Sequence, residues 1–414
     1  MIVLGSVAAL TCVLTAADVR VDSLAALRET VAAAKPGDRV VLATGMYQGS
    51  LTLSGVRGEK DRPVVIAGAD PANPPIIRAG GGSGSACIHL SKPAFVTLEH
   101  LVLERATGNG VNIDDGADRS TLAPGVTLRS LRVRDIGAGC GEGRAGTGNC
   151  DGIKLSGLSG FVVEDCTIER WGTGGSGVDM VGCHNGLVRN SVFRHAPAGE
   201  RGQDGASGVQ IKGGSRGVTV RSCRFEHAGQ RAVNIGGSTG LDYFRPPLKP
   251  GAGERSEAAA VVVEGCTFFG GDAAVAFVGV DGADVRFNTI YRPRRWAMRI
   301  LQENREPGFV PCRGGTFTDN IVVLGDGVGG RAATAVNVGD GTRAAHFTFA
   351  RNAWFTNDRS KRPPASLPAQ ELNGVYGVEP RLRDPERGDF TPGEGNPCAK
   401  AGAKALPPQP KDVR

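Results

Sequence analysis

The residues with the clearest capacity for chemistry are lysines and aspartates at matching places in short apolar segments. Lys154, Asp179 and Lys212 occur in the successive segments IKLSG, VDMVG and VQIKG. An amine whose pKa is set by neighbouring charges can take up a proton, and further cations can stabilise the negative charge that forms on a substrate. We therefore expect Lys212 to act as a general base, Lys154 and Arg231 to hold an anionic group, and Asp179 to orient them or to bind a metal.

These residues belong to a longer series of polar positions. Alternate residues of a strand point to opposite faces, so the second residue of each segment faces outward while its aliphatic neighbours face the core. The outward series is His89, Asn112, Lys154, Asp179, Gln210, Asn234, Arg299 and Asn337, with Ala276 or Phe277 as the member from segment 273–280. We expect this column to form the floor of an extended groove that binds a polymer; the alternative is a solvated sheet face stabilised by side-chain ladders.

Several residues are candidates for direct contact with a ligand. Within the column these are Asn112, Gln210, Asn234 and Arg299. His195 and His227 occupy equivalent places one repeat apart and are either groove-wall contacts or stacked surface histidines. The insertion 239–259 brings Tyr243 and Arg245 together, and an aromatic ring beside a guanidinium suits a sugar and its carboxylate. The same insertion could instead be a hydrophobic plug over the sheet.

The elements that must position these residues are short strands that repeat along the chain. One pattern recurs in nine copies between residues 95 and 355, as in GFVVEDCTIER and GVTVRSCRFEH: two stretches of alternating apolar and polar residues, separated by a polar two-residue corner. Strands this short bury a core only when successive coils stack. With 63 glycines in 414 residues, a helix bundle is excluded. The sequence predicts one all-β domain, a right-handed parallel β-helix over residues 18–356.

One position just after the corner indicates how the coils stack. Equivalent side chains of successive coils lie about 4.8 Å apart in a parallel β-helix. We expect buried thiols followed by an asparagine ladder in a column made of Leu101, Leu131, Cys166, Ser191, Cys223, Cys266, Asn288, Asn320 and Asn352.

The two ends of the chain differ from the repeats. Residues 1–17 carry no charged side chain and end in small residues, which is typical of a signal peptide and predicts a secreted, periplasmic or cell-surface protein without a membrane span. Residues 22–35 form an amphipathic helix that caps the first coil, and 357–414 form an irregular Pro-rich tail on the last coils. Cys140 and Cys150 are the best disulfide candidates.

The charge balance bears on partners. The net charge of +6 favours an anionic partner such as an acidic polysaccharide, and no run of five like charges points to nucleic acid. We expect a monomer.

The first coils resemble a known group of proteins. The stretches KPGD (35–38), GMY (45–47) and RPVVI (62–66) resemble the start of secreted right-handed β-helix proteins, above all polysaccharide lyases of the alginate lyase and chondroitinase B type in the pectate-lyase-like superfamily. The resemblance implies β-elimination on a uronate-containing polysaccharide, with a lysine, an assisting arginine one coil further on, and calcium held by acidic residues. Lys212 occupies the place of that lysine, Gly236 stands where the arginine would be, and Asp179 and Asp204 are the nearest candidates for calcium.

Three other functions stay open on the same fold. Residues 149–152, NCDG, are similar to the Asn-Thr-Asp-Gly motif of polygalacturonase-like hydrolases, which would make Asp151 and Asp179 the acid and base of a glycoside hydrolase. An epimerase is a further possibility, although its Asp-Pro-His motif is absent. The protein could also bind carbohydrate without catalysis.

Overall fold

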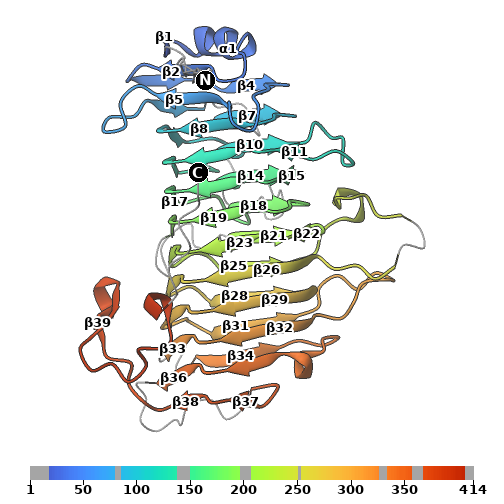
Figure 1. Cartoon of the computed structure of the whole chain (residues 1–414), viewed down its shortest axis with the longest axis vertical. Coiled ribbons are helices and arrows are strands. Elements are labelled where there is room, and N and C mark those ends of the chain that lie inside the picture. The colour runs from blue at the N-terminus through green and yellow to red at the C-terminus, as the bar shows by residue number, and fades with distance from the viewer. Residues whose placement is uncertain are drawn as a thin grey trace, which may run out of the picture.

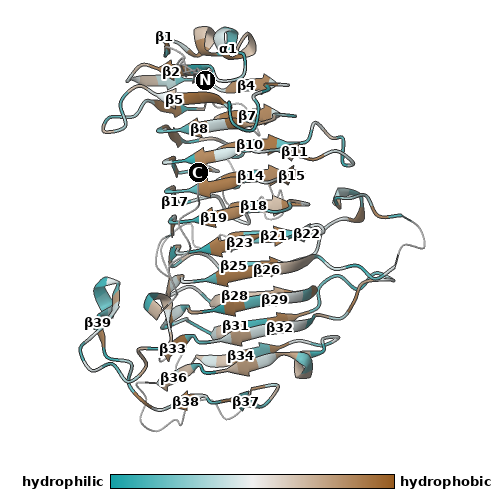
Figure 2. Ribbon diagram, viewed as in Figure 1, coloured by the Kyte–Doolittle hydropathy of each residue, from teal (hydrophilic) through white to brown (hydrophobic). Residues whose placement is uncertain are grey.

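In a computed structural model, residues 18–79, 85–137, 150–195, 207–249, 253–325, 333–356 and 367–405 are described. Within these residues the chain winds through three long parallel sheets of ten, twelve and fourteen strands, and its coils stack along the long axis of the molecule (Figure 1). Hydrophobic residues concentrate in the stacked strands, whereas many loops are hydrophilic (Figure 2). This is the predicted parallel β-helix.

The ten-stranded sheet carries the predicted polar column. Its strands, in spatial order, are β4 (Leu51–Ser54), β7 (Ile88–Ser91), β10 (Val111–Asp114), β14 (Ile153–Ser156), β18 (Ser176–Val181), β21 (Ser207–Lys212), β25 (Arg231–Gly236), β28 (Ala273–Val278), β31 (Trp296–Leu301) and β34 (Thr334–Val338).

The other two sheets complete each coil. The fourteen-stranded sheet contains β1 (Val19–Val21), β2 (Arg39–Leu42), β5 (Val64–Gly68), β8 (Val96–Glu99), β12 (Thr127–Arg129), β16 (Val162–Glu164), β19 (Leu187–Arg189), β23 (Thr219–Arg221), β26 (Ala258–Glu264), β29 (Val280–Arg286), β32 (Arg313–Thr318), β35 (Thr348–Ala350) and β37 (Glu371–Leu372), with β22 (Ser215–Arg216) paired to β26. The twelve-stranded sheet contains β3 (Met46–Gln48), β6 (Ile76–Arg78), β9 (Val102–Glu104), β13 (Arg132–Arg134), β17 (Thr167–Glu169), β20 (Val192–Arg194), β24 (Arg224–Glu226), β27 (Thr267–Phe269), β30 (Thr289–Tyr291), β33 (Ile321–Leu324), β36 (Ala353–Thr356) and β38 (Val375–Tyr376).

A left-handed residue makes the corner between these last two sheets. His100 separates β8 from β9 with a φ of 55°, and the same place is taken by Ser130, Asp165, Asn190, Ser222, Phe287, Asp319 and Arg351 in other coils. One residue in this region turns the strand sharply while the residue after it still points into the core. The corner therefore recurs without requiring glycine each time.

Behind the corner, the predicted internal column is buried. Asn288 and Asn320 donate through their backbone N–H and side-chain amide to the Oδ1 of the next asparagine, at 2.9–3.0 Å. The thiols of Cys166, Cys223 and Cys266 precede them and are at most 2% exposed. On the neighbouring strands, Phe193, Phe225 and Phe268 stack with ring centroids 4.8 and 4.9 Å apart. The cysteines thus act as core side chains, as expected.

The two ends of the solenoid differ. Helix α1 (Leu24–Ala32) is capped by Ser23, whose side chain accepts a hydrogen bond from the N–H of Ala26, and it buries Leu27 and Val31 on the first coil. At the other end, β37 and β38 continue two of the sheets beyond residue 356, within the segment that the sequence predicted as a tail packed on the last coils. These strands are only two residues long and largely exposed, so no alternating pattern marks them in the sequence. The chain then forms the hairpin of β39 (Leu382–Asp384) and β40 (Asp389–Pro392), and Phe390 packs against Tyr291.

Candidate functional site

The strand register confirms the predicted outward column. Paired positions in the ten-stranded sheet run Thr52, His89, Asn112, Lys154, Asp179, Gln210, Asn234, Ala276, Arg299 and Asn337. Ala276, and not Phe277, is the member from β28, because Phe277 points into the core and is fully buried.

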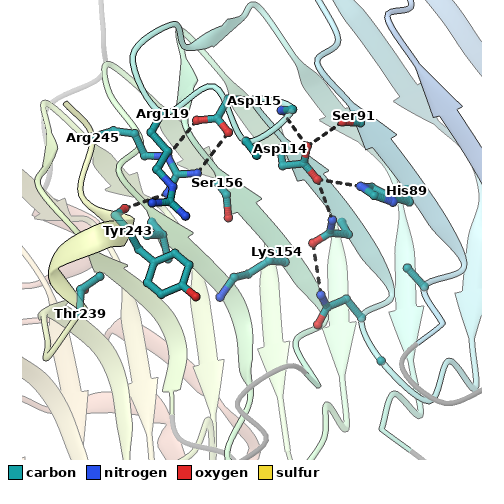
Figure 3. A pocket seen from close by; sticks show the side chains of 18 of the residues that line it. His89, Ser91, Asp114, Asp115, Arg119, Lys154, Ser156, Thr239, Tyr243 and Arg245 are labelled. Carbon is teal, nitrogen blue, oxygen red and sulfur yellow. Dashed lines mark hydrogen bonds and ion pairs between the residues drawn. The ribbon is translucent and has the colours of Figure 1, made fainter. Parts of the chain in front are cut away.

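A cleft of about 1060 Å³ lies over the first half of this sheet. Its floor includes His89, Asn112, Lys154 and Lys212, and its rim includes Tyr243 from the insertion after β25. Figure 3 shows Lys154 and Tyr243 extending into this space from the sheet and from the loop. The groove expected from the sequence therefore exists, but it covers only part of the column.

Four charged side chains form a network at the floor of the cleft. Lys154 Nζ pairs closely with Asp179 Oδ2 and lies 3.5 Å from Asp151 Oδ2, while Lys212 Nζ lies 3.6 Å from Asp179 Oδ1. Both carboxylates are nearly buried, with side chains 2–3% exposed, whereas the lysines are 14% and 20% exposed. The sheet thus presents ammonium groups to the cleft and keeps their counter-ions beneath.

The two carboxylates have opposite pKa shifts. Burial raises the pKa of Asp151 to about 7, since the attraction of Lys154 only partly offsets desolvation. Although Asp179 is also buried, the ammonium groups of Lys154 and Lys212 hold its pKa below the ordinary value. The pKa of Lys154 is raised by the two carboxylates against the effect of its own burial. Of the two carboxylates beneath the lysines, Asp179 is thus held ionised and Asp151 is shifted toward its protonated form.

A histidine–aspartate pair stands at the other end of the cleft. His89 Nε2 is 2.7 Å from Asp114 Oδ2, and Asp114 also accepts hydrogen bonds from Ser91 Oγ and the N–H of Gly116 (Figure 3). These bonds lower the pKa of Asp114 although its partial burial acts to raise it. The sequence placed His89 in the column but missed Asp114, which is the last residue of β10 and lies in a second outward column.

The insertion after β25 is anchored by Arg245. Its Nε and Nη2 donate to the two oxygens of Asp115 at 2.9 and 3.1 Å, and both side chains are at most 5% exposed. Side chains at Gly157 and Gly182, which end β14 and β18, would collide with this pair. Arg245 is thus engaged in fixing the loop, while Tyr243 is 56% exposed. Nothing in the sequence identified Asp115 as the partner, because the two residues are 130 positions apart.

The remaining predicted residues lie in different places. Gln210 accepts a hydrogen bond from Ser176 Oγ beside the network. Arg231 contacts Asn234 and Glu303, and Arg299 donates to Asn337 and covers the ring of Trp296 at 4.2 Å, all beyond the cleft.

The two candidate histidines are not part of the cleft lining. His195 is 4% exposed and packs edge-on against Trp171. His227 packs beside Phe269, with ring centroids 5.0 Å apart. Both follow strands of the twelve-stranded sheet.

The described residues do not fit calcium. Asp179 is engaged by two ammonium groups, and in the described ranges no cluster of three or more acidic, histidine or cysteine side chains could hold a metal ion. Asp204, the other candidate, lies outside the described residues. Cys150 is disulfide-bonded, and its predicted partner Cys140 also lies outside them.

The chain belongs to the right-handed β-helix family, whose model matches residues 86–243 and 151–352. No curated protein matches the sequence. An alginate lyase from Paenibacillus sp. str. FPU-7 is structurally similar at 15% identity and a TM-score of 0.53, over 80% of this chain and 98% of that one.

Two other solved structures are less similar. A mannuronic acid specific polysaccharide family 6 lyase from human gut microbiota has 14% identity and a TM-score of 0.46, over 89% and 93% of the two chains. A GH136 lacto-N-biosidase from Eubacterium ramulus has the same identity and TM-score, over 85% and 64%. The molecule is thus distantly similar to polysaccharide lyases and to a glycoside hydrolase. Among the described residues, no helix is long and apolar enough to cross a membrane.

Proposed function

We propose that this protein is exported and cleaves a uronate-containing polysaccharide by β-elimination in the cleft of the ten-stranded sheet. One observation carries the proposal: the side chains of Lys154 and Lys212 face the cleft, while the carboxylates that pair with them, Asp151 and Asp179, lie buried beneath and out of reach of a ligand. An acidic sugar brings the missing negative charge to this place. The structurally similar alginate lyase supports the choice of a uronate polymer.

Elimination needs a cation near the sugar carboxylate and a base near the adjacent carbon. The proton next to a carboxylate is weakly acidic, and pairing the carboxylate with a cation stabilises the negative charge that forms when the proton leaves. Lys154 is suited to this pairing because its raised pKa keeps it charged. Lys212 is the proposed base: after its ammonium group has released a proton to water, its Nζ takes the proton from the carbon; the electron pair forms a carbon–carbon double bond, the bond to the glycosidic oxygen breaks, and water protonates that oxygen.

The surrounding residues position the reacting groups. Asp179 pairs with both lysines and so fixes their ammonium groups relative to each other. Tyr243 offers an exposed ring at the rim, on which a sugar can pack, and Arg119 covers that ring at 5.1 Å. Asn112, on the neighbouring strand β10, can hydrogen-bond sugar hydroxyl groups.

The test is to incubate the protein with polymannuronate, polyguluronate, polygalacturonate and chondroitin sulfate. Ultraviolet absorbance of the new double bond and the release of reducing ends are followed together. Substituting Lys212→Ala should lower elimination at least about 100-fold, the usual scale for a general base, while Lys92→Ala, a surface control, should leave it unchanged. Absence of unsaturated products from every polymer would refute elimination.

A glycoside hydrolase is the second candidate, and the opposite pKa shifts of Asp151 and Asp179 favour it. Two neighbouring carboxyl groups with separated pKa values can serve as acid and base. Both, however, lie beneath Lys154, with side chains only 2–3% exposed. Reducing ends without unsaturated products, lost in Asp151→Asn, would favour hydrolysis over elimination.

A further inference from the structure

An ion pair crosses the ten-stranded sheet just beyond the cleft. Arg231 is the first residue of β25, and Glu303 follows β31, two coils further along the sheet. Arg231 Nη2 lies 2.6 Å from Glu303 Oε1. Since the two residues come from opposite ends of their strands, the pair runs obliquely over the intervening strand β28.

The outward positions at this bridge are covered. Asn234 is 3% exposed and accepts a hydrogen bond from Arg231 Nη1, and the outward side chains of Ala276 and Val278 are fully buried. Leu301 packs with these two in a small apolar cluster on the outside of the solenoid. In the cleft, by contrast, His89, Asn112 and Lys154 of the same column are partly exposed. The groove over the described part of the sheet is therefore interrupted at the coils of β25 and β28.

The charged network lies close to this interruption. Lys212 is on β21, the immediate neighbour of β25, and adjacent strands are about 4.8 Å apart. On the other side, the cleft extends from Lys154 across β10 and β7 to Thr52 of β4. A bound polymer thus has several coils of open sheet on one side of the lysines and about one coil on the other.

We propose that the Arg231–Glu303 pair is the end wall of the cleft, so that the protein takes its polysaccharide by one chain end. This inference rests on the proposed acidic-polysaccharide function and adds the mode of action: short products are released from a terminus.

The first test measures binding and does not depend on cleavage. Uronate hexamers carrying a bulky fluorophore at the reducing or at the non-reducing end are titrated into Lys212→Ala protein, beside the unlabelled hexamer. A label facing the wall should weaken binding at least about tenfold, while the same label at the opposite end should change it little. Equal tolerance of both labels would overturn the proposal.

Removing the wall provides the decisive comparison. In Arg231→Ala/Glu303→Ala the label that faces the wall should weaken binding by less than about threefold. The control Glu59→Ala/Arg62→Ala, which removes an exposed ion pair, should keep the full loss of affinity. The Arg231–Glu303 pair is partly exposed, with side chains 18% and 36% accessible, so its loss should leave the fold intact, as thermal unfolding will verify. An unchanged penalty in the folded double variant refutes the wall.

Analysis of the products made by protein that retains Lys212 then separates the two proposals. Chain-end action predicts short products from the first time points with slow loss of polymer viscosity, and the wall-less variant should produce longer ones. Early random fragments from the unmodified protein would overturn the end wall while supporting elimination. Absence of cleavage would refute the proposed function. The difference in binding between the two labelled ends would still show whether the Arg231–Glu303 pair closes the cleft. Failure of every hexamer to bind to the unmodified protein as well as to Lys212→Ala would overturn both.

Discussion

The raised pKa of Asp151 predicts an unusual dependence of stability on pH. Its pKa in the folded protein is about 7, against an ordinary value of 3.8, so the folded state favours the protonated form. The stabilisation is fully present below pH 3.8 and is lost as the pH rises through about 7. About two pH units of this range lie above pH 5, and at about 1.4 kcal/mol per unit they correspond to a loss of up to about 3 kcal/mol.

Asp151→Asn should remove this loss. The asparagine keeps an Oδ1 for the N–H of Ser176, which donates to Asp151 at 2.7 Å, but it cannot ionise. The free energy of unfolding of both proteins is measured in urea at about pH 5 and about pH 8. Between these pH values it should fall by about 1 to 3 kcal/mol more in wild type than in the variant. The six histidines are present in both proteins, so any contribution from them cancels in this difference.

The matched control is Asp135→Asn. Asp135 pairs with Arg170 on the twelve-stranded sheet, and this pair lowers its pKa, so Asp135 stays ionised over the whole range. Its replacement should shift stability equally at both pH values. If Asp151→Asn behaved like this control, Asp151 would be ionised in the folded protein throughout, and the argument for a protonated carboxyl under Lys154 would be wrong.

Two further predictions concern the elements that hold the site. Arg245→Ala leaves the fully buried Asp115 without its cation and should lower the free energy of unfolding by about 3–5 kcal/mol. Adding Asp115→Asn should restore part of that loss in urea denaturation. If the double variant instead lost the sum of the two single losses, the pairing would be contradicted. Asn320→Ala deprives the amides of Asn288 of their acceptor and should cost at least about 1–3 kcal/mol by the same assay, whereas exposed Asn73→Ala should cost almost nothing.

The sequence predicted the solenoid and the outward column because both depend on a local rule. Strand alternation and the repeat length alone determine that Lys154 stacks on Asp179 and Asp179 on Gln210. Even the asparagine ladder follows from aligning the copies. No long-range information was needed for these features.

The limits of the cleft depend on contacts that no repeat encodes. The Arg245–Asp115 and Arg231–Glu303 pairs join residues 130 and 72 positions apart, and each involves a loop whose path the alternation pattern does not determine. The sequence could nominate Arg231 and Arg245 for an anionic ligand from their charge. It could not reveal that carboxylates of the same chain already pair with them.

The asparagine ladder also has a direction. Each N–H and side-chain amide donates to the carbonyl oxygen of the next coil, until Asn352 donates to Glu371 Oε1. The other carboxylate oxygen of Glu371 accepts from Trp354 and Tyr376, so this side chain takes up donors and has none to pass on. A further coil stacked here, whether from the same chain or from another molecule, would find no continuing amide donor in this column. A single carboxylate thus ends the chain of hydrogen-bond donors in this column at the last described coil.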